Sequence, residues 1–253
     1  MFKLIKYEYR KDLPLYIVLF AAIFALELYV LVSIWSESEL NMSISFVLYI
    51  MGGLTGMLFI LIMGAVSYSK EINSKFSYMT FMTPRSTYQI VGSKYLSIFM
   101  ATVVATILYI LFAYIDVTLI CLYFEDVKNV AEMLDLVLDA MGMDLSGAIM
   151  SLLAALFVQW INIFFIISCS YLAITLSATV LSNRRGKTPL ALLFFIVIII
   201  IANIIRSNLP TFDYGDSIIA YIANSWTEIL FEFAMIGGTY FGVSALLKHK
   251  VSL

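Results

Sequence analysis

The stretch LLFFIVIIII, from Leu192 to Ile201, is an unbroken run of apolar residues, and it decides the class of fold. A helix needs about 20 predominantly apolar residues to cross a bilayer core of about 30 Å. Here the apolar segment runs from Pro189 to Ile205. A chain buried in lipid must be helical or part of a closed barrel. The run lacks the apolar–polar alternation of a barrel strand, so it predicts a membrane-spanning helix.

The rest of the chain has the composition of an integral membrane protein. Of its 253 residues, 62% are hydrophobic and only 13% are charged, whereas soluble domains carry about a quarter charged residues. Five other segments are also apolar and at least as long, and the fourth, Ala148–Leu181, is longer than a span requires. The six predicted spans are approximately Leu15–Trp35, Ser43–Tyr68, Tyr95–Tyr123, Ala148–Leu181, Pro189–Ile205 and Trp226–Leu247. The predicted fold is therefore all-α integral membrane, with six transmembrane helices.

The distribution of positive charge predicts how these helices are oriented. Cytoplasmic loops of membrane proteins carry an excess of Lys and Arg. Of the 15 basic residues, all except Lys128 and Arg206 fall in segments that six alternating spans place on one side. We therefore expect both termini and residues 69–94 in the cytoplasm. The acidic loop at residues 124–147 and the region at 206–225 are then outside.

Residues 1–12 predict an amphipathic helix that lies in the cytoplasmic membrane interface. Apolar side chains share one face of this helix and cations share another, namely Phe2, Ile5 and Tyr9 against Lys3, Lys6 and Arg10. Such a segment places its apolar side in the membrane and its cations against lipid headgroups.

Prolines and glycines give local expectations. Asp12 and Pro14 predict a turn between the interfacial helix and the first span, and Thr188 with Pro189 predicts the N-cap and first residue of the fifth. No proline is expected to interrupt a membrane helix. Two GxxxG motifs occur in spans, at Gly52 and Gly56 and at Gly238 and Gly242. This spacing favours close helix packing, within the chain or between chains.

A few polar residues lie inside the predicted spans, where they are energetically expensive. The acids are Glu27, Asp116, Glu228 and Glu232, all in the predicted outer half of the membrane, and Gln159 lies in the fourth span. One interpretation is a translocation path with an acidic outer vestibule that receives a cationic substrate. The alternative is that these groups form hydrogen bonds with neighbouring helices or reach water.

The sequence lacks the motifs of several catalytic classes. It contains no GxxxxGK[ST] phosphate loop, and its single histidine, His249, lies near the C-terminal end. Neither a metal site nor a nucleic-acid partner is expected. The chain is therefore predicted not to be an enzyme by itself, and to bind no cofactor of its own.

The segment SKEINSKFSYMTFMTPRSTYQIVGSK, Ser69–Lys94, is polar and yet carries an apolar stripe. Its first half predicts a short helix that ends before Pro84. The side chains of its apolar face, with the acid that precedes them, are Glu71, Ile72, Phe76, Tyr78, Met79 and Met82. An exposed apolar patch of this kind indicates a protein partner. The alternative is a helix that rests in the membrane interface.

This segment resembles the cytoplasmic coupling loop of type-2 ABC exporter permeases. The matching residues are Glu71, Phe76–Met82, Thr83 with Pro84, Arg85 with Ser86, Ile90, Gly92 and Lys94. The charged-Gly opening of that loop is replaced here by Glu71-Ile72-Asn73. Residues 1–12 resemble the connecting helix of this family, and residues 206–225 resemble its re-entrant region before the last span.

The resemblance implies that residues 1–253 form a single transmembrane permease domain. A separate ABC-type ATPase would bind ATP and Mg²⁺ and would dock on residues 71–82, while a second copy or close relative would complete the transport path. Small permeases of this kind resemble exporters of amphipathic or cationic peptides, including the phenol-soluble-modulin group, in the cell membrane of bacteria. The alternatives are an ion- or proton-coupled secondary transporter, or an exporter of lipids or drugs.

Overall fold

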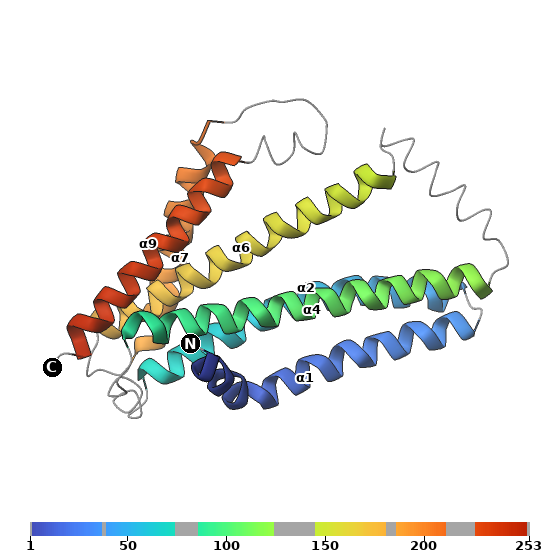
Figure 1. Ribbon diagram of the computed structural model, residues 1–253, viewed down its shortest axis with the longest axis horizontal. Helices are drawn as coiled ribbons and strands as arrows, with labels where there is room; N and C mark the ends of the chain where they lie inside the picture. The colour runs from blue at the N-terminus through green and yellow to red at the C-terminus, as the bar shows by residue number, and fades with distance from the viewer. Residues whose placement is uncertain are drawn as a thin grey trace. The chain divides into compact units, whose positions relative to one another are not determined.

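The computed structural model describes residues 2–36, 39–73, 86–123, 145–180, 186–210 and 226–251. Nearly all of these residues are helical (Figure 1). The helices are α1 (Phe2–Trp35), α2 (Glu39–Asn73), α4 (Thr87–Tyr123), α6 (Leu145–Val180), α7 (Lys187–Ser207) and α9 (Trp226–Val251).

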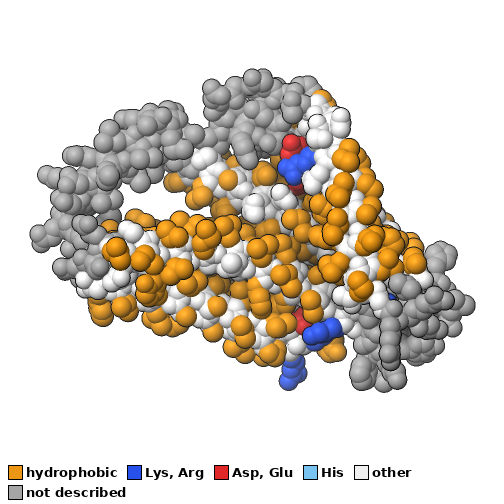
Figure 2. All heavy atoms as spheres, turned by 180° about the vertical axis from the view of Figure 1, so that it is seen from behind, with side chains coloured by type: hydrophobic (Ala, Val, Ile, Leu, Met, Phe, Trp, Pro, Cys, Tyr) orange, Lys and Arg blue, Asp and Glu red, His pale blue; other side chains and the backbone are white. Residues whose placement is uncertain are grey.

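All six helices are long and apolar enough to cross a membrane, so the chain is a multi-pass, all-α membrane protein, as predicted. Figure 2 shows one face of the molecule, on which hydrophobic side chains predominate and charged side chains form small separate groups. Large hydrophobic residues are exposed along every span, for example Ile62, Ile107 and Phe241 at 62%, 51% and 63%. Such exposure is stable only where hydrocarbon surrounds the protein.

Two helices extend further into the predicted cytoplasmic loop than the apolar segments predict. Helix α2 continues to Asn73 and α4 begins at Thr87, so both ends of the predicted coupling loop belong to the neighbouring membrane helices. Residues 74–85 lie outside the described residues, and so does most of the short helix expected there. The same is true of residues 124–144, in the loop predicted to be outside, and of residues 211–225.

The expected turn at Asp12 and Pro14 is wrong. Helix α1 continues through both residues, and Pro14 lies inside it without interrupting it. Proline lacks the amide hydrogen and its ring crowds the carbonyl group four residues earlier, here that of Arg10. A long helix accommodates this by bending rather than by ending, so a proline near a boundary is an unreliable stop signal.

The predicted start of the fifth span is also two residues too late. Helix α7 begins at Lys187, and its N-cap is Gly186, which has φ +116° and makes no side-chain cap. A positive φ of this kind favours glycine. Pro189 therefore lies in the first helical turn, where the amide hydrogen that it lacks has no helical partner in any case.

The chain divides into two compact units, and α1, α2 and α4 each contribute to both. The second unit contains residues 11–60 and 100–150. Its core side chains on α1 recur at intervals of three or four residues, the spacing of one helical face: Tyr16, Leu19, Ile23, Glu27, Val30 and Ile34. Val30 and Ile34 pack with Tyr49 of α2, and Tyr109 and Phe112 of α4 pack against this cluster.

Two tyrosines join α2 to α4 in this unit. The Tyr49 hydroxyl donates to the carbonyl oxygen of Tyr109 at 2.7 Å, and the Tyr109 hydroxyl donates to that of Tyr49 at 2.8 Å. Gly52 and Gly53 make room for the Tyr109 ring, because a Cβ at either position would crowd it. The first GxxxG motif is thus used for packing within the chain. At Gly238 and Gly242, by contrast, an added Cβ meets no described atom within 4 Å.

The first unit contains residues 1–10, 61–99 and 151–253. Helices α6, α7 and α9 pack there around Phe165, Cys169 and Ala202. A group of tyrosines joins α2, α4, α6 and α9, with Tyr68 stacked on Tyr171 at a ring distance of 4.0 Å and Tyr95 against Tyr171 at 5.0 Å. The Tyr68 hydroxyl is hydrogen-bonded to that of Thr175 at 2.7 Å, so the polar atom of a fully buried ring has a partner.

The two glycine motifs predict different responses to alanine. In Gly52→Ala the new methyl would lie 2.9 Å from the Tyr109 hydroxyl, and it would also meet Leu26. Displacing the hydroxyl breaks its bond to Tyr49, so we expect a loss of about 1–3 kcal/mol in the free energy of unfolding. Gly238→Ala is the matched control and should be neutral or slightly stabilising, because alanine favours helix. Thermal unfolding in detergent measures both. Equal effects would contradict this account of the packing.

Candidate functional site

The charged cluster with the most extensive burial in the first unit centres on Lys94. Its ammonium group donates a hydrogen bond of 2.8 Å to Oε1 of Glu8 and forms a second ion pair with the carboxylate of Glu71. Lys94 is 3% exposed and Glu8 is 8% exposed. We call these three residues the Lys94 cluster. It joins the first turns of α1, which we call the N-terminal segment, to the end of α2 and the beginning of α4.

The local sequence explains how these groups come together. In the N-terminal segment Ile5 and Glu8 are buried and Tyr9 is half-buried, whereas Lys3 and Lys6 are exposed. Glu8 therefore lies on the same inner side as Ile5, opposite the exposed lysines. Tyr9 adds a second contact to α4, since its hydroxyl donates to the carbonyl oxygen of Ser97 at 2.8 Å.

The energetics of the Lys94 cluster are those of a buried ion pair. Removing a charge from water costs several kcal/mol, and the pair compensates for this cost only if its geometry is good. Removing one partner leaves the other charge buried and unpaired, which costs about 3–5 kcal/mol. The cluster therefore holds the three segments together as long as all three charges are present.

The structure describes only part of the predicted ATPase-docking surface. Glu71 has its carboxylate paired with Lys94, and Ile72 is half-buried. Phe76, Tyr78, Met79 and Met82 lie outside the described residues. In the sequence, Glu71 precedes residues 74–85 and Lys94 follows them. Two members of the Lys94 cluster therefore flank this segment of the chain. Sequence reasoning identified Glu71 and Lys94 in the loop but did not predict their pairing or the part of Glu8.

Two of the predicted vestibule acids form an ion-pair network with Arg206. The guanidinium of Arg206 contacts Oε2 of Glu228 through Nε at 2.8 Å and through Nη2 at 2.5 Å, and its Nη1 lies 3.2 Å from Oε1 of Glu232. This network connects the end of α7 to the beginning of α9. It agrees with the alternative interpretation of these two acids as partners of a neighbouring helix.

The other vestibule candidates have different surroundings. Glu27 and Asp116 belong to the second unit, are 3% and 1% exposed, and lie close enough for their charges to interact. Gln159 belongs to the first unit and is exposed on α6. The five predicted path residues therefore fall into an acid pair, an ion-pair network and an isolated amide.

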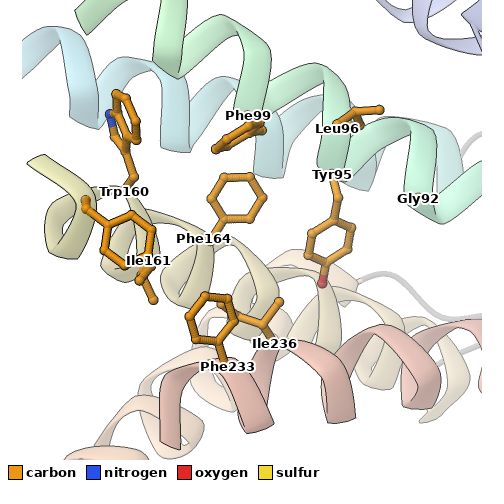
Figure 3. A pocket seen from close by; sticks show the side chains of 10 residues that line it. Gly92, Tyr95, Leu96, Phe99, Trp160, Ile161, Phe164, Phe233 and Ile236 are labelled. Carbon is orange, nitrogen blue, oxygen red and sulfur yellow. The ribbon is translucent and has the colours of Figure 1, made fainter. Parts of the chain in front are cut away.

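The first unit also contains an apolar pocket of about 550 Å³, a size typical of small-molecule sites. Helices α4, α6 and α9 line it (Figure 3), with Gly92, Tyr95, Leu96, Phe99, Phe157, Trp160, Ile161, Phe164, Phe233 and Ile236. The Phe99 ring lies 5.0 Å from that of Phe164, in an edge-to-face arrangement. The pocket was not predicted. Its signal in the sequence is the recurrence of aromatic residues at helical spacing, at Tyr95 and Phe99 and at Phe157, Trp160 and Phe164.

The pocket and the Lys94 cluster share one segment of α4. Lys94 contacts Glu8 and Glu71, while its neighbours Gly92, Tyr95 and Leu96 line the pocket. A displacement of this segment would therefore change both. Among the described residues no group of three His, Cys, Asp or Glu side chains could hold a metal ion.

Comparison with known proteins gives no match, whether to a protein-family model, to a curated protein or to a solved structure.

The Lys94 cluster predicts a specific pattern of stability. Lys94→Met leaves Glu8 and Glu71 buried without the ammonium group, so we expect the free energy of unfolding to fall by about 3–5 kcal/mol. Replacing both acids by Gln in the same chain removes the uncompensated charges and should restore part of the loss. Lys6→Met, on the exposed side of the same segment, is the matched control and should change little. If Lys94→Met is as mild as Lys6→Met in thermal unfolding, the ion pairs do not stabilise the fold.

Proposed function

We propose that this chain is the membrane-spanning permease subunit of an ATP-driven exporter of the ABC type. In this proposal a separate subunit binds ATP and Mg²⁺ and hydrolyses the nucleotide. The proposal is supported by the six apolar helices, by the absence of a phosphate-loop motif from the sequence, and by the resemblance of residues 71–94 to the coupling loop of type-2 permeases.

The observation that carries the proposal is the Lys94 cluster. In the sequence, Glu71 precedes residues 74–85 and Lys94 follows them. The side chain of Lys94 is ion-paired both with Glu71 and with Glu8. A subunit that pushes on residues 74–85 would therefore move the end of α2, the beginning of α4 and the N-terminal segment together. A coupling segment needs this property, because nucleotide-driven domain closure transmits force by rigid-body displacement.

The proposed partner is an ATPase with an apolar groove on its membrane-facing side. Phe76, Tyr78, Met79 and Met82 would provide the anchor side chains for that groove, since aromatic residues and Met are enriched at interfaces. A second copy of the chain, or a close relative, would complete the transport path.

The proposed cargo is an amphipathic or cationic peptide, and the proposed location is the cell membrane of a bacterium. The apolar pocket in Figure 3 is suited to the hydrophobic face of such a peptide. Ten of the 17 acidic residues fall in the predicted outer loops, which favours a cationic cargo on that side. Lipids or drugs are the alternative cargoes.

Docking on residues 74–85 predicts the effect of charge substitutions there. Phe76→Asp and Met79→Asp should each prevent co-purification of the proposed ATPase partner, because a carboxylate in an apolar interface is left unpaired and desolvated. Leu40→Asp is the matched control, since Leu40 is 70% exposed at the opposite end of α2. Its ATPase recovery should equal that of the wild type.

A transport assay separates the exporter from its main alternative, an ion- or proton-coupled secondary transporter. Reconstituted vesicles that take up a cationic amphipathic peptide only with both the ATPase and ATP support the exporter. Transport by the chain alone, driven by an ion gradient, would contradict it, as would unchanged ATPase binding in both Asp variants.

A further inference from the structure

We propose that Glu27 and Asp116 together form a proton-binding site inside the bundle that α1, α2 and α4 make in the second unit. This inference goes beyond the exporter proposal and does not rest on it, because the site consists of this chain's own side chains. The chemical species bound is a proton, held between two carboxyl groups.

Both carboxyl groups lie on the inner face of their helices. Glu27 follows Ile23 and precedes Val30 on the buried stripe of α1. Asp116 lies one helical turn beyond Phe112 and Ala113, which pack on the Val30 cluster. Glu27 is 3% exposed and Asp116 is 1% exposed, so neither carboxyl group faces the surrounding lipid or water.

These carboxyl groups lack the partners that the other buried acids have. Oε2 of Glu27 and both carboxyl oxygens of Asp116 have no hydrogen-bond partner among the described residues. Glu8 and Glu71 are paired with Lys94, whereas Glu228 and Glu232 are paired with Arg206. Within the described part of the second unit the basic residue is Lys11, and it lies sixteen residues before Glu27, roughly 24 Å along a helix.

The neighbouring hydroxyl groups do not replace a cation. Tyr49 and Tyr109 are near enough to interact electrostatically with Glu27, but each donates its hydroxyl hydrogen to the backbone carbonyl of the other. Two negative charges at this place would be unpaired, desolvated and mutually repulsive.

A proton would neutralise one of these two negative charges, and it needs fewer oxygen ligands than a metal cation does. Divalent cations such as Ca²⁺ and Mg²⁺ need six or more oxygen ligands, and the described surroundings offer two carboxyl groups and two hydroxyls that are already engaged. A proton needs a single oxygen, and a buried acid without a cationic partner is stable only when it is neutral. Two neighbouring carboxyl groups share such a proton readily, because they cannot both ionise.

Protonation of this pair would also act on the helices. With a proton on one of the two carboxyl groups, the repulsion between Glu27 of α1 and Asp116 of α4 is removed. Without it, two like charges repel each other in a medium of low dielectric constant. Binding and release of the proton therefore favour two different packings of α1 against α4, which is the requirement for a conformational switch.

The test uses the infrared carbonyl band of protonated carboxylic acids, which is separate from the bands of ionised carboxylates. The chain is purified into lipid nanodiscs at neutral pH, as wild type, as Glu27→Gln, as Asp116→Asn and as the double variant. The wild-type spectrum minus the double-variant spectrum should show a protonated carboxyl band that shifts in D₂O. Glu228→Gln is the matched control, and its difference spectrum should show only the loss of an ionised carboxylate, because Glu228 is paired with Arg206.

A double-variant difference spectrum that contains only ionised carboxylate bands would overturn the proposal. Thermal unfolding gives a second measurement. The amides are isosteres of the neutral acids, so the double variant should fold and keep its Tm within about 4 °C of the wild type, and neither protein should respond to added Na⁺, Mg²⁺ or Ca²⁺. A wild-type Tm that rises with one of these ions, with the response abolished in the double variant, would identify a metal-cation site instead and overturn the proposal. A double variant that fails to fold would also overturn it.

Discussion

The structure depends on one constraint, which is that hydrocarbon provides no hydrogen-bond partner, so every polar group in the spans must find one inside the protein. The backbone meets this constraint by forming helices. Many hydroxyl groups in the spans meet it by donating to a carbonyl three or four residues earlier, as Ser33, Ser93, Ser97, Thr106, Thr175 and Ser177 do. The tyrosine pair of α2 and α4 meets it through bonds between two helices. The same constraint explains why the buried charges of the first unit occur as the Lys94 cluster and the Arg206 network.

This arrangement gives the charged groups different tasks. The Lys94 cluster joins three segments at the beginning of α4, and the next residues of that helix line the apolar pocket. In our proposal an ATPase that presses on residues 74–85 therefore moves the wall of the pocket through Lys94. The Arg206 network joins the beginning of α9 to the end of α7. Among the described residues, the acid pair of the second unit has no cation of this kind. A group that breaks the general rule of pairing is the natural place for a ligand, which we propose to be a proton.

The class of fold and the six spans were predictable from the sequence, because apolar runs such as Leu192–Ile201 are unambiguous in length and composition. Helix ends were less predictable. Pro14 lies inside α1 because a long helix can continue past a proline, and Gly186 caps α7 through its backbone conformation, which composition does not encode. The site was predictable only as a set of residue types. Glu71 and Lys94 were recognised by resemblance. The ion pair of Lys94 with Glu8 joins residues 86 positions apart in the sequence, a separation at which periodicity carries no information.

The central claim is that the end of the molecule that carries the Lys94 cluster faces the cytoplasm, where an ATPase can reach it. Labelling of single cysteines tests this claim most directly, at Ser86 next to α4 and at Ser36 after α1, both of which are exposed. The background chain has Cys121 and Cys169 replaced by Ala. In intact cells a membrane-impermeant thiol reagent should label the cysteine at position 36, and it should label position 86 only after the membrane is opened. Labelling of position 86 in intact cells, with position 36 protected, would contradict the account.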